Sequence, residues 1–116
     1  SRFWNKILGI ELTASEDVHS QGVITDIYDT GKGKIELLVD KYPDSPIGKF
    51  LKRRGPGVHH ICLQVDNIEK AIKYLLEEDV NIIGDSAIIG AEGYKVIFIH
   101  PNSTGGVLVE LAEKKN

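Results

Sequence analysis

The spacing of apolar residues changes once along the first forty positions, from helical to strand-like. Phe3 pairs with Ile7 and Trp4 with Leu8 at helical spacing, and Gly9 is placed to end that helix. Three segments of strand character follow, and they predict a small antiparallel meander: residues 10–18, 22–30 and 34–40. The chain therefore begins in a helix and continues into a sheet.

A second helix is predicted where a polar capping residue precedes proline, in the sequence DSP at residues 44–46. It continues through IGKFLKRR and ends at the Gly-Pro-Gly of residues 55–57. We therefore divide the chain into a first module of residues 1–42, a connecting helix and linker of residues 43–57, and a second module of residues 58–116.

The second module opens with a strand, VHHICLQV at residues 58–65, and Asp66 or Asn67 is placed to cap the helix that follows over residues 67–78. One face of this helix is apolar, with Ile68, Ala71, Ile72, Leu75 and Leu76. Three more strands are predicted, over residues 80–88, 94–100 and 106–112. The module thus reads strand, helix, strand, strand, strand, which indicates an α+β fold.

The two halves share a degenerate repeat. Placing IELL (residues 35–38) over VELA (residues 109–112) aligns Glu36 with Glu110 at a period of 74 residues. The first half has no counterpart of the strand at residues 58–65. We expect a pair of related modules, the first of which lacks its opening strand in this sequence.

Composition and charge narrow the classes of function. With 41% hydrophobic residues, 27% charged residues and a net charge of −3, the chain of 116 residues is typical of a globular protein and shows no preference for nucleic acid or membranes. No apolar run is long enough to span a bilayer. The lone Cys62 has no internal disulfide partner, which is compatible with the cytoplasmic location that we expect.

Ionisable residues interrupt three of the predicted strands. Side chains alternate across a strand, so His60 shares a face with Cys62 and Gln64, whereas His59 shares the opposite face with the apolar residues expected to pack on the helix. By the same rule, Glu110 and Glu36 lie on the faces turned away from the apolar residues of their strands. Each of these three strands therefore carries an ionisable candidate, His60, Glu110 or Glu36, on its less apolar face.

Two interpretations of these groups compete. Taken singly, a histidine or glutamate on a half-buried strand faces solvent or a neighbour. If the three faces converge, however, the two carboxylates would be buried together, and a bound cation would offset the high cost of burying them. Imidazole with two carboxylates is a ligand set that suits divalent transition metals.

The segments that carry these residues resemble a known family. GPGVHHICLQVDNIEKAI, DSPIGKFLKRRG and IGAEGYKVIFIHPNSTGGVLVEL together are similar to the methylmalonyl-CoA epimerase family, of the vicinal oxygen chelate superfamily that includes glyoxalase. The resemblance covers nearly the whole chain. It implies paired βαβββ modules whose sheets curl around a metal site, in agreement with the pattern above.

The resemblance implies that His60, Glu110 and Glu36 bind one divalent metal ion of the cobalt, zinc, manganese or nickel class. The family's first ligand, a histidine on the opening strand, would precede Ser1. Either that strand belongs to the protein but lies before this sequence, or a shorter protein leaves its place open or fills it from a partner subunit. An uncapped helix with apolar Phe3 and Trp4 favours the first explanation.

The implied reaction interconverts (2R)- and (2S)-methylmalonyl-CoA by proton abstraction at C2, through a metal-stabilised enolate, with Glu110 and Glu36 as catalytic bases on opposite sides. Some family members carry a glutamate at the place of Thr25, and threonine is a poor base, so Glu36 is assigned the second role. The resemblance also implies an acyl-CoA substrate and a homodimer.

Four further residues are candidates for substrate binding. Gln21 occupies a family-like position, and Asn102, Ser103 and Thr104 lie in the loop HPNSTGG, which could receive a carboxylate or could serve only as a turn. Two alternative functions remain: a glyoxalase-like lyase or isomerase of the lactoylglutathione lyase type on another small substrate, and a non-catalytic binding protein of the same fold. The carboxylate pair argues against the latter, because sequestering a ligand requires neither base nor metal.

Overall fold

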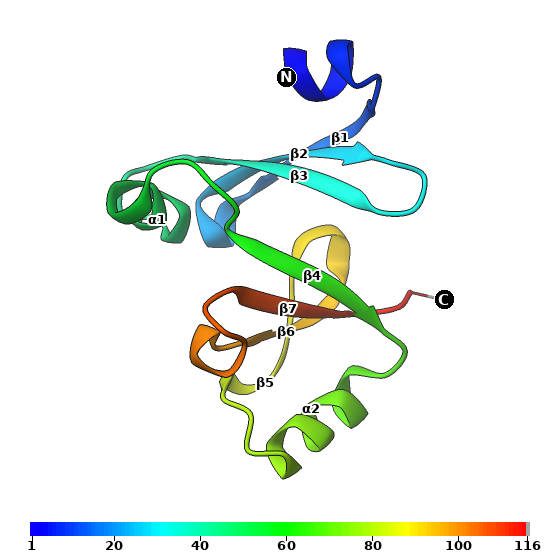
Figure 1. The fold of residues 1–116 in the computed structure, drawn as a ribbon, viewed down its shortest axis with the longest axis vertical. Coiled ribbons are helices and arrows are strands. Elements are labelled where there is room, and N and C mark those ends of the chain that lie inside the picture. Colours follow the sequence, from blue (N-terminus) through cyan, green and yellow to red (C-terminus); the bar gives the residue numbers. More distant parts are fainter. Residues whose placement is uncertain (116) are drawn as a thin grey trace. The chain divides into compact units, whose positions relative to one another are not determined.

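The computed structural model describes residues 1–115, and the chain divides into two compact units, Ser1–Gly57 and Val58–Asn116. Each unit contains one β-sheet of its own (Figure 1). No helix among the described residues combines the length and the apolar character that crossing a membrane requires.

The first unit is built on a three-stranded antiparallel sheet in the order β1-β2-β3, which confirms the predicted meander. Its strands are β1 (Glu11–Val18), β2 (Val23–Asp29) and β3 (Lys34–Asp40). A single-turn helix η1 (Arg2–Ile7) precedes them and a short 3₁₀ helix η2 (His19–Gln21) joins β1 to β2. Gly9 follows η1 with a φ of 73°, the left-handed conformation that glycine adopts readily at helix ends.

The helix α1 (Pro46–Arg54) completes the first unit and begins as the sequence predicts. The Ser45 hydroxyl accepts a hydrogen bond from the Gly48 amide at 3.0 Å, and Pro46 occupies the first helical position. Because Ser45 is buried, this cap satisfies a backbone donor that water does not reach.

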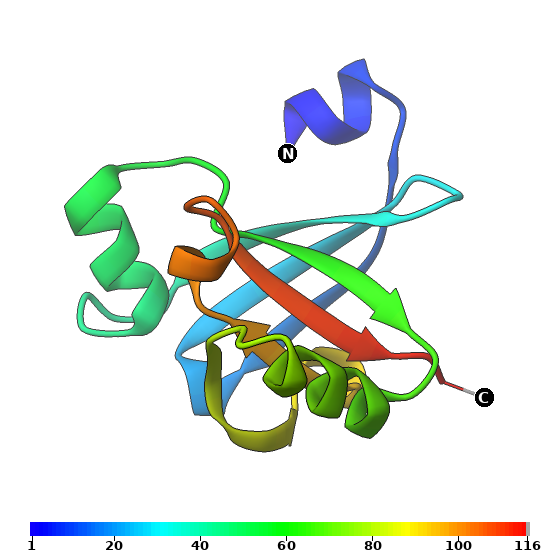
Figure 2. The same cartoon turned by 60° about the horizontal axis from the view of Figure 1, so that its bottom comes forward.

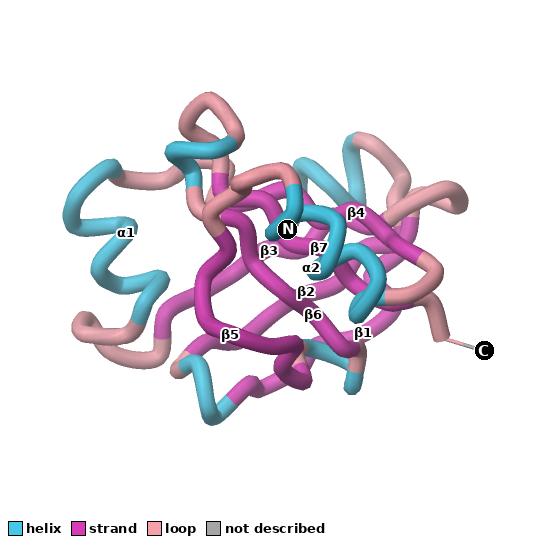
Figure 3. Tube along the Cα trace, turned by 90° about the horizontal axis from the view of Figure 1, so that it is seen from below, coloured by secondary structure: helices cyan, strands magenta, loops and turns pink. Residues whose placement is uncertain are grey.

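The second unit has the predicted order strand, helix, strand, strand, strand and confirms the α+β class. Its elements are β4 (His60–Val65), α2 (Ile68–Glu77), β5 (Ile82–Ile89), β6 (Lys95–Ile99) and β7 (Leu108–Glu113), with 3₁₀ turns η3 (Ala91–Gly93) and η4 (Pro101–Ser103). The sheet order is β4-β7-β6-β5, in which β4 runs parallel to β7 and the other pairs are antiparallel. β5 curves where its register with β6 shifts between Ile83 and Ile88 (Figure 3).

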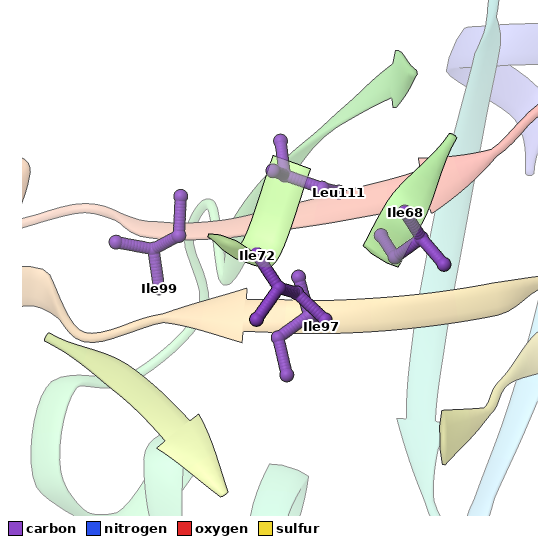
Figure 4. Packing of buried hydrophobic residues seen from close by; sticks show 5 residues of the cluster. All are labelled: Ile68, Ile72, Ile97, Ile99 and Leu111. Carbon is purple, nitrogen blue, oxygen red and sulfur yellow. The ribbon is translucent and has the colours of Figure 1, made fainter. Parts of the chain in front are cut away.

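The core of the second unit lies between α2 and one face of its sheet (Figures 2 and 4). Its buried members are Ile68 and Ile72 of α2, Ile97 and Ile99 of β6, and Leu111 of β7. The helical spacing of the first two and the strand alternation of the others place all five in this layer.

Three apolar residues assigned to this layer are exposed instead. Leu76 ends outside the core, and Ile61 and Leu63 of β4 remain 48% and 55% exposed. The reason is topological: α2 packs on β5, β6 and β7, whereas β4 is the edge strand beyond them. The face of β4 that is directed toward the core was predicted correctly, since Val65 packs against the core. The prediction that α2 covers the whole of that face was wrong.

The start of α2 is held by two side chains. Asn67 accepts a hydrogen bond from the Lys70 amide at 2.9 Å, which identifies it as the capping residue. In addition, the Glu113 carboxylate on β7 accepts a hydrogen bond from the Ile68 amide at 3.0 Å. A carboxylate at this end of a helix also interacts favourably with the helix dipole.

We expect Glu113→Gln to lower the free energy of unfolding by about 1 kcal/mol, because it removes a charge from the helix N-terminus. Urea denaturation followed by circular dichroism would measure the change. The matched control is Glu77→Gln at the other end of α2, where neutralising an acidic residue should leave stability unchanged or slightly higher. Equal losses in the two variants would contradict the capping role.

Candidate active site

The candidate site begins with two neighbouring strands of the second unit. His60 is the first residue of β4, and Glu110 lies on β7 directly opposite Cys62. Residues that are paired across strands share a face, and so do residues two apart on one strand. His60 and Glu110 therefore lie on the same face of the sheet, opposite the face that packs against α2.

The two side chains meet there. The distance between His60 Nε2 and Glu110 Oε1 is 3.0 Å, and the side chains are 20% and 14% exposed. A carboxylate this far from solvent needs a donor or a cation, and the imidazole occupies that position. The structure thus brings together two side chains that strand alternation placed on the less apolar faces of their strands.

The donor atoms of this pair are suited to a divalent transition metal. Nitrogen and oxygen ligands each lie about 2.1 Å from such an ion, so two ligands that subtend roughly 90° to 109° are about 3.0 to 3.4 Å apart. The separation of His60 Nε2 from Glu110 Oε1, 3.0 Å, lies at the lower end of that range and is also that of a direct ion pair. An imidazole and a carboxylate are also a mixed set that favours zinc-like ions over calcium.

His59 does not follow the prediction that separated it from His60. Its Nδ1 lies 3.0 Å from Nδ1 of His60, and the two rings pack edge to face with centroids 5.2 Å apart. The alternation argument fails because β4 begins only at His60, so His59 precedes the regular strand. Both histidines therefore belong to the candidate site.

Two other neighbours of the pair were not identified from the sequence. Phe98 of β6 is paired with Glu110, and its ring lies edge-on to His60 with centroids 6.0 Å apart. Gly90 also lies near the pair: a Cβ added to it would come 3.8 Å from Glu110 Oε2 and 3.1 Å from Val96. The register of β6 and β7 could have revealed Phe98, but no sequence pattern pointed to Gly90.

Glu36 lies in the first unit, on β3, paired with Ile27 of β2. It occupies the third position of its strand, as Glu110 does in β7, so each unit repeats this placement. Thr25, on the same face as Glu36, is buried. Among the described residues, no three His, Cys, Asp or Glu side chains lie close enough together to hold a metal. Glu36 as a third ligand therefore stays a prediction.

The four candidate substrate residues lie in two turns. Gln21 is exposed at the end of η2. In and after η4, Asn102 Oδ1 accepts a hydrogen bond from the Asn81 side chain at 3.1 Å, and Ser103 Oγ accepts one from the Asn81 amide at 3.0 Å. Thr104 donates to the carbonyl oxygens of Pro101 and Val107. These bonds explain the polar loop as a turn, and its role in substrate binding stays a prediction.

The chemical capacity of the site follows from this arrangement. Oε1 of Glu110 faces His60, while Oε2 is directed toward the side where Gly90 has no side chain. One carboxylate thus has one oxygen next to a potential metal ligand and the other near a glycine, which carries no side chain. Such a group is able to bind a cation and to exchange a proton with a bound molecule.

Comparison with known proteins indicates the family of the chain. The model of the Glyoxalase/Bleomycin resistance protein/Dioxygenase superfamily matches residues 1–98. The mitochondrial methylmalonyl-CoA epimerase of Dictyostelium discoideum is 44% identical over 96% of this chain and 68% of its own length. The mitochondrial methylmalonyl-CoA epimerase of Bos taurus is 42% identical over 96% of this chain, which spans 64% of the bovine protein.

Solved structures show the same relationship. A hypothetical protein from Bacillus halodurans superposes with a TM-score of 0.96 and 43% identity over 99% of this chain and 83% of its own. Methylmalonyl-CoA epimerase from Mycobacterium tuberculosis has a TM-score of 0.91 and 28% identity, over 99% and 78% of the two chains. A variant of the Streptomyces coelicolor epimerase in complex with 2-nitronate-propionyl-CoA has a TM-score of 0.89 and 29% identity, over 99% and 86%.

Three observations identify the family of the chain. They are the order of elements in the second unit, the contact between His60 and Glu110, and these similarities. The chain belongs to the glyoxalase/bleomycin resistance protein/dioxygenase superfamily and, within it, to the methylmalonyl-CoA epimerase family.

Proposed function

We propose that this protein epimerises methylmalonyl-CoA at C2, by moving a proton between that carbon and a carboxylate. The observation that carries the proposal is the pairing of His60 with Glu110 on one sheet face. The chain that contains this pair is 44% identical to the methylmalonyl-CoA epimerase of Dictyostelium discoideum. The Streptomyces coelicolor relative, in complex with 2-nitronate-propionyl-CoA, supports an acyl-CoA as the substrate class.

In this reaction Glu110 takes the proton from C2. The electron pair of the C–H bond moves toward the thioester carbonyl, whose oxygen becomes negatively charged. Oε2 is the oxygen suited to this step, since Oε1 faces His60 at 3.0 Å and Oε2 lies on the side of Gly90. A positioned base of this kind accelerates proton transfer by roughly 10² to 10⁴-fold.

His60 Nε2 and Glu110 Oε1 would hold the divalent metal ion, with Glu36 as a further ligand. When bound, the metal supplies positive charge that stabilises the negative charge developing on the substrate oxygen. The donor spacing of the pair supports this role. Cobalt, zinc, manganese and nickel all accept this ligand set.

Inversion at C2 also needs a proton donor on the opposite face of the carbon. Glu36 is proposed for that role because it repeats the position of Glu110 in the corresponding strand of the other unit. Two carboxylates related in this way let one remove the proton while the other returns one. The predicted homodimer belongs to this proposal and is tested separately by light scattering.

The test is deuterium exchange at C2. Full-length protein loaded with Co²⁺ or Zn²⁺ is incubated with methylmalonyl-CoA in deuterated water, and C2 is followed by NMR or mass spectrometry. We expect incorporation well above background, and its loss when a chelator removes the metal. No incorporation above background would overturn the proposal. Turnover of the glutathione–methylglyoxal hemithioacetal instead would favour the lyase alternative.

A further inference from the structure

The imidazole of His60 has a partner at each of its ring nitrogens. Nε2 lies 3.0 Å from Glu110 Oε1, and Nδ1 lies 3.0 Å from Nδ1 of His59. The ring of Phe98 packs edge-to-face against it. These three contacts leave the ring one orientation, because turning it over would place a carbon opposite the carboxylate.

The contact between the two histidines restricts where protons reside. Two ring nitrogens 3.0 Å apart form a hydrogen bond only if one carries a proton and the other presents a lone pair. A nitrogen that binds a metal must likewise present its lone pair. If Nε2 of His60 is the ligand, the neutral ring carries its proton on Nδ1, and that proton points at His59.

We propose that His59 is a positioning residue: it accepts the Nδ1–H of His60 and thereby keeps Nε2 of His60 in its ligand form beside Glu110. This inference rests on the metal-binding part of the proposed function. His59 Nδ1 is then the acceptor, so the proton of a neutral His59 resides on its own Nε2. A hydrogen-bond partner of this kind fixes both the tautomer and the orientation of a ligating histidine.

A hydrogen bond donated in the opposite direction, from His59 to His60, makes a different prediction. If His59 donated to Nδ1 of His60, a neutral His60 would carry its proton on Nε2, the nitrogen that faces Glu110. That tautomer does not bind a metal through Nε2. The position of one proton therefore separates the two arrangements.

Two variants of His59 separate hydrogen bonding from packing. His59→Asn keeps an acceptor oxygen close to the place of Nδ1, whereas His59→Phe keeps a ring but has no acceptor. We expect His59→Phe to weaken Zn²⁺ binding by about 10 to 100-fold in isothermal titration calorimetry, while His59→Asn stays within about threefold of the original protein. His19→Asn, at an exposed histidine of the first unit, is the control and should bind normally.

The inference is overturned if His59→Phe binds Zn²⁺ as tightly as the original protein, or if both His59 variants lose affinity equally, as a packing role would produce. Nitrogen-15 NMR of the zinc-loaded original protein gives a second readout that needs no variant to fold. We expect His60 to show a metal-bound Nε2 and a protonated Nδ1. Zinc on Nδ1, or the shared proton on His59, would overturn the inference.

Neither readout uses the substrate, so the two proposals fail separately. A protein that exchanges no deuterium but shows the expected Zn²⁺ affinities and proton positions loses the epimerase assignment and keeps the role of His59. A metal-dependent epimerase whose Zn²⁺ affinity is unchanged in His59→Phe loses only the role of His59. An original protein that binds no Zn²⁺ overturns the role of His59, and the deuterium exchange then decides the epimerase assignment by itself.

Discussion

Replacing Glu110 with glutamine is expected to lower the rate of deuterium incorporation at C2 of methylmalonyl-CoA by about 10² to 10⁴-fold. Glutamine has nearly the shape of glutamate and keeps a side-chain oxygen at the same place beside His60, but its amide does not take a proton at neutral pH. The loss therefore reports the missing base rather than a rearranged strand. The measurement is the same C2 exchange assay, run at saturating metal so that a weaker site is still filled.

The matched control for Glu110→Gln is Glu113→Gln on the same strand. Glu113 lies on the opposite face of the sheet, where it caps α2, so its loss should cost stability and leave the exchange rate within about twofold. A rate for Glu110→Gln within tenfold of the original protein at saturating metal would contradict the assignment of Glu110 as base.

Replacing His60 with alanine is expected to weaken Zn²⁺ binding by more than about 100-fold. The removal of a residue that only supports a ligand typically costs 10 to 100-fold in affinity, and the removal of the ligand itself should cost more. The variant also leaves the Glu110 carboxylate, 14% exposed, without the imidazole that lies 3.0 Å from it. Isothermal titration calorimetry measures the affinity.

The control for His60→Ala is His19→Ala, because the His19 side chain is 81% exposed in the first unit. We expect its Zn²⁺ affinity to equal that of the original protein. If His60→Ala also bound Zn²⁺ with unchanged affinity, the metal site would have to lie elsewhere, and the fit of the donor spacing between His60 and Glu110 would be coincidental.

Much of the fold could be predicted because each element carries its own local pattern. Alternation identified the strands of both sheets, and helical spacing together with the capping signals at DSP (residues 44–46) and at Asp66 or Asn67 identified α1 and α2. Strand alternation also placed His60 and Glu110 on one face, because the two-residue period holds throughout a regular strand.

The same reasoning failed where a residue's position depended on strand limits or on neighbours distant in sequence. His59 was expected to lie apart from His60 on the opposite face, yet its ring contacts that of His60, because the regular strand begins one residue after His59. Ile61 and Leu63 were expected to be covered, but β4 is the edge strand of its sheet and α2 packs mainly on β5, β6 and β7. The Glu113 bond to α2 joins residues 45 positions apart, and no local pattern contains it.

By itself the sequence determined the order of elements, the α+β class and the residue types of the candidate site, because these depend on periods and caps within a few positions. Only the tertiary structure decided that Nε2 of His60 faces Glu110 and that Nδ1 faces His59. A sequence does not show which of the two imidazole nitrogens contacts which neighbour. They become distinct only when packing fixes the ring and gives each nitrogen its own partner.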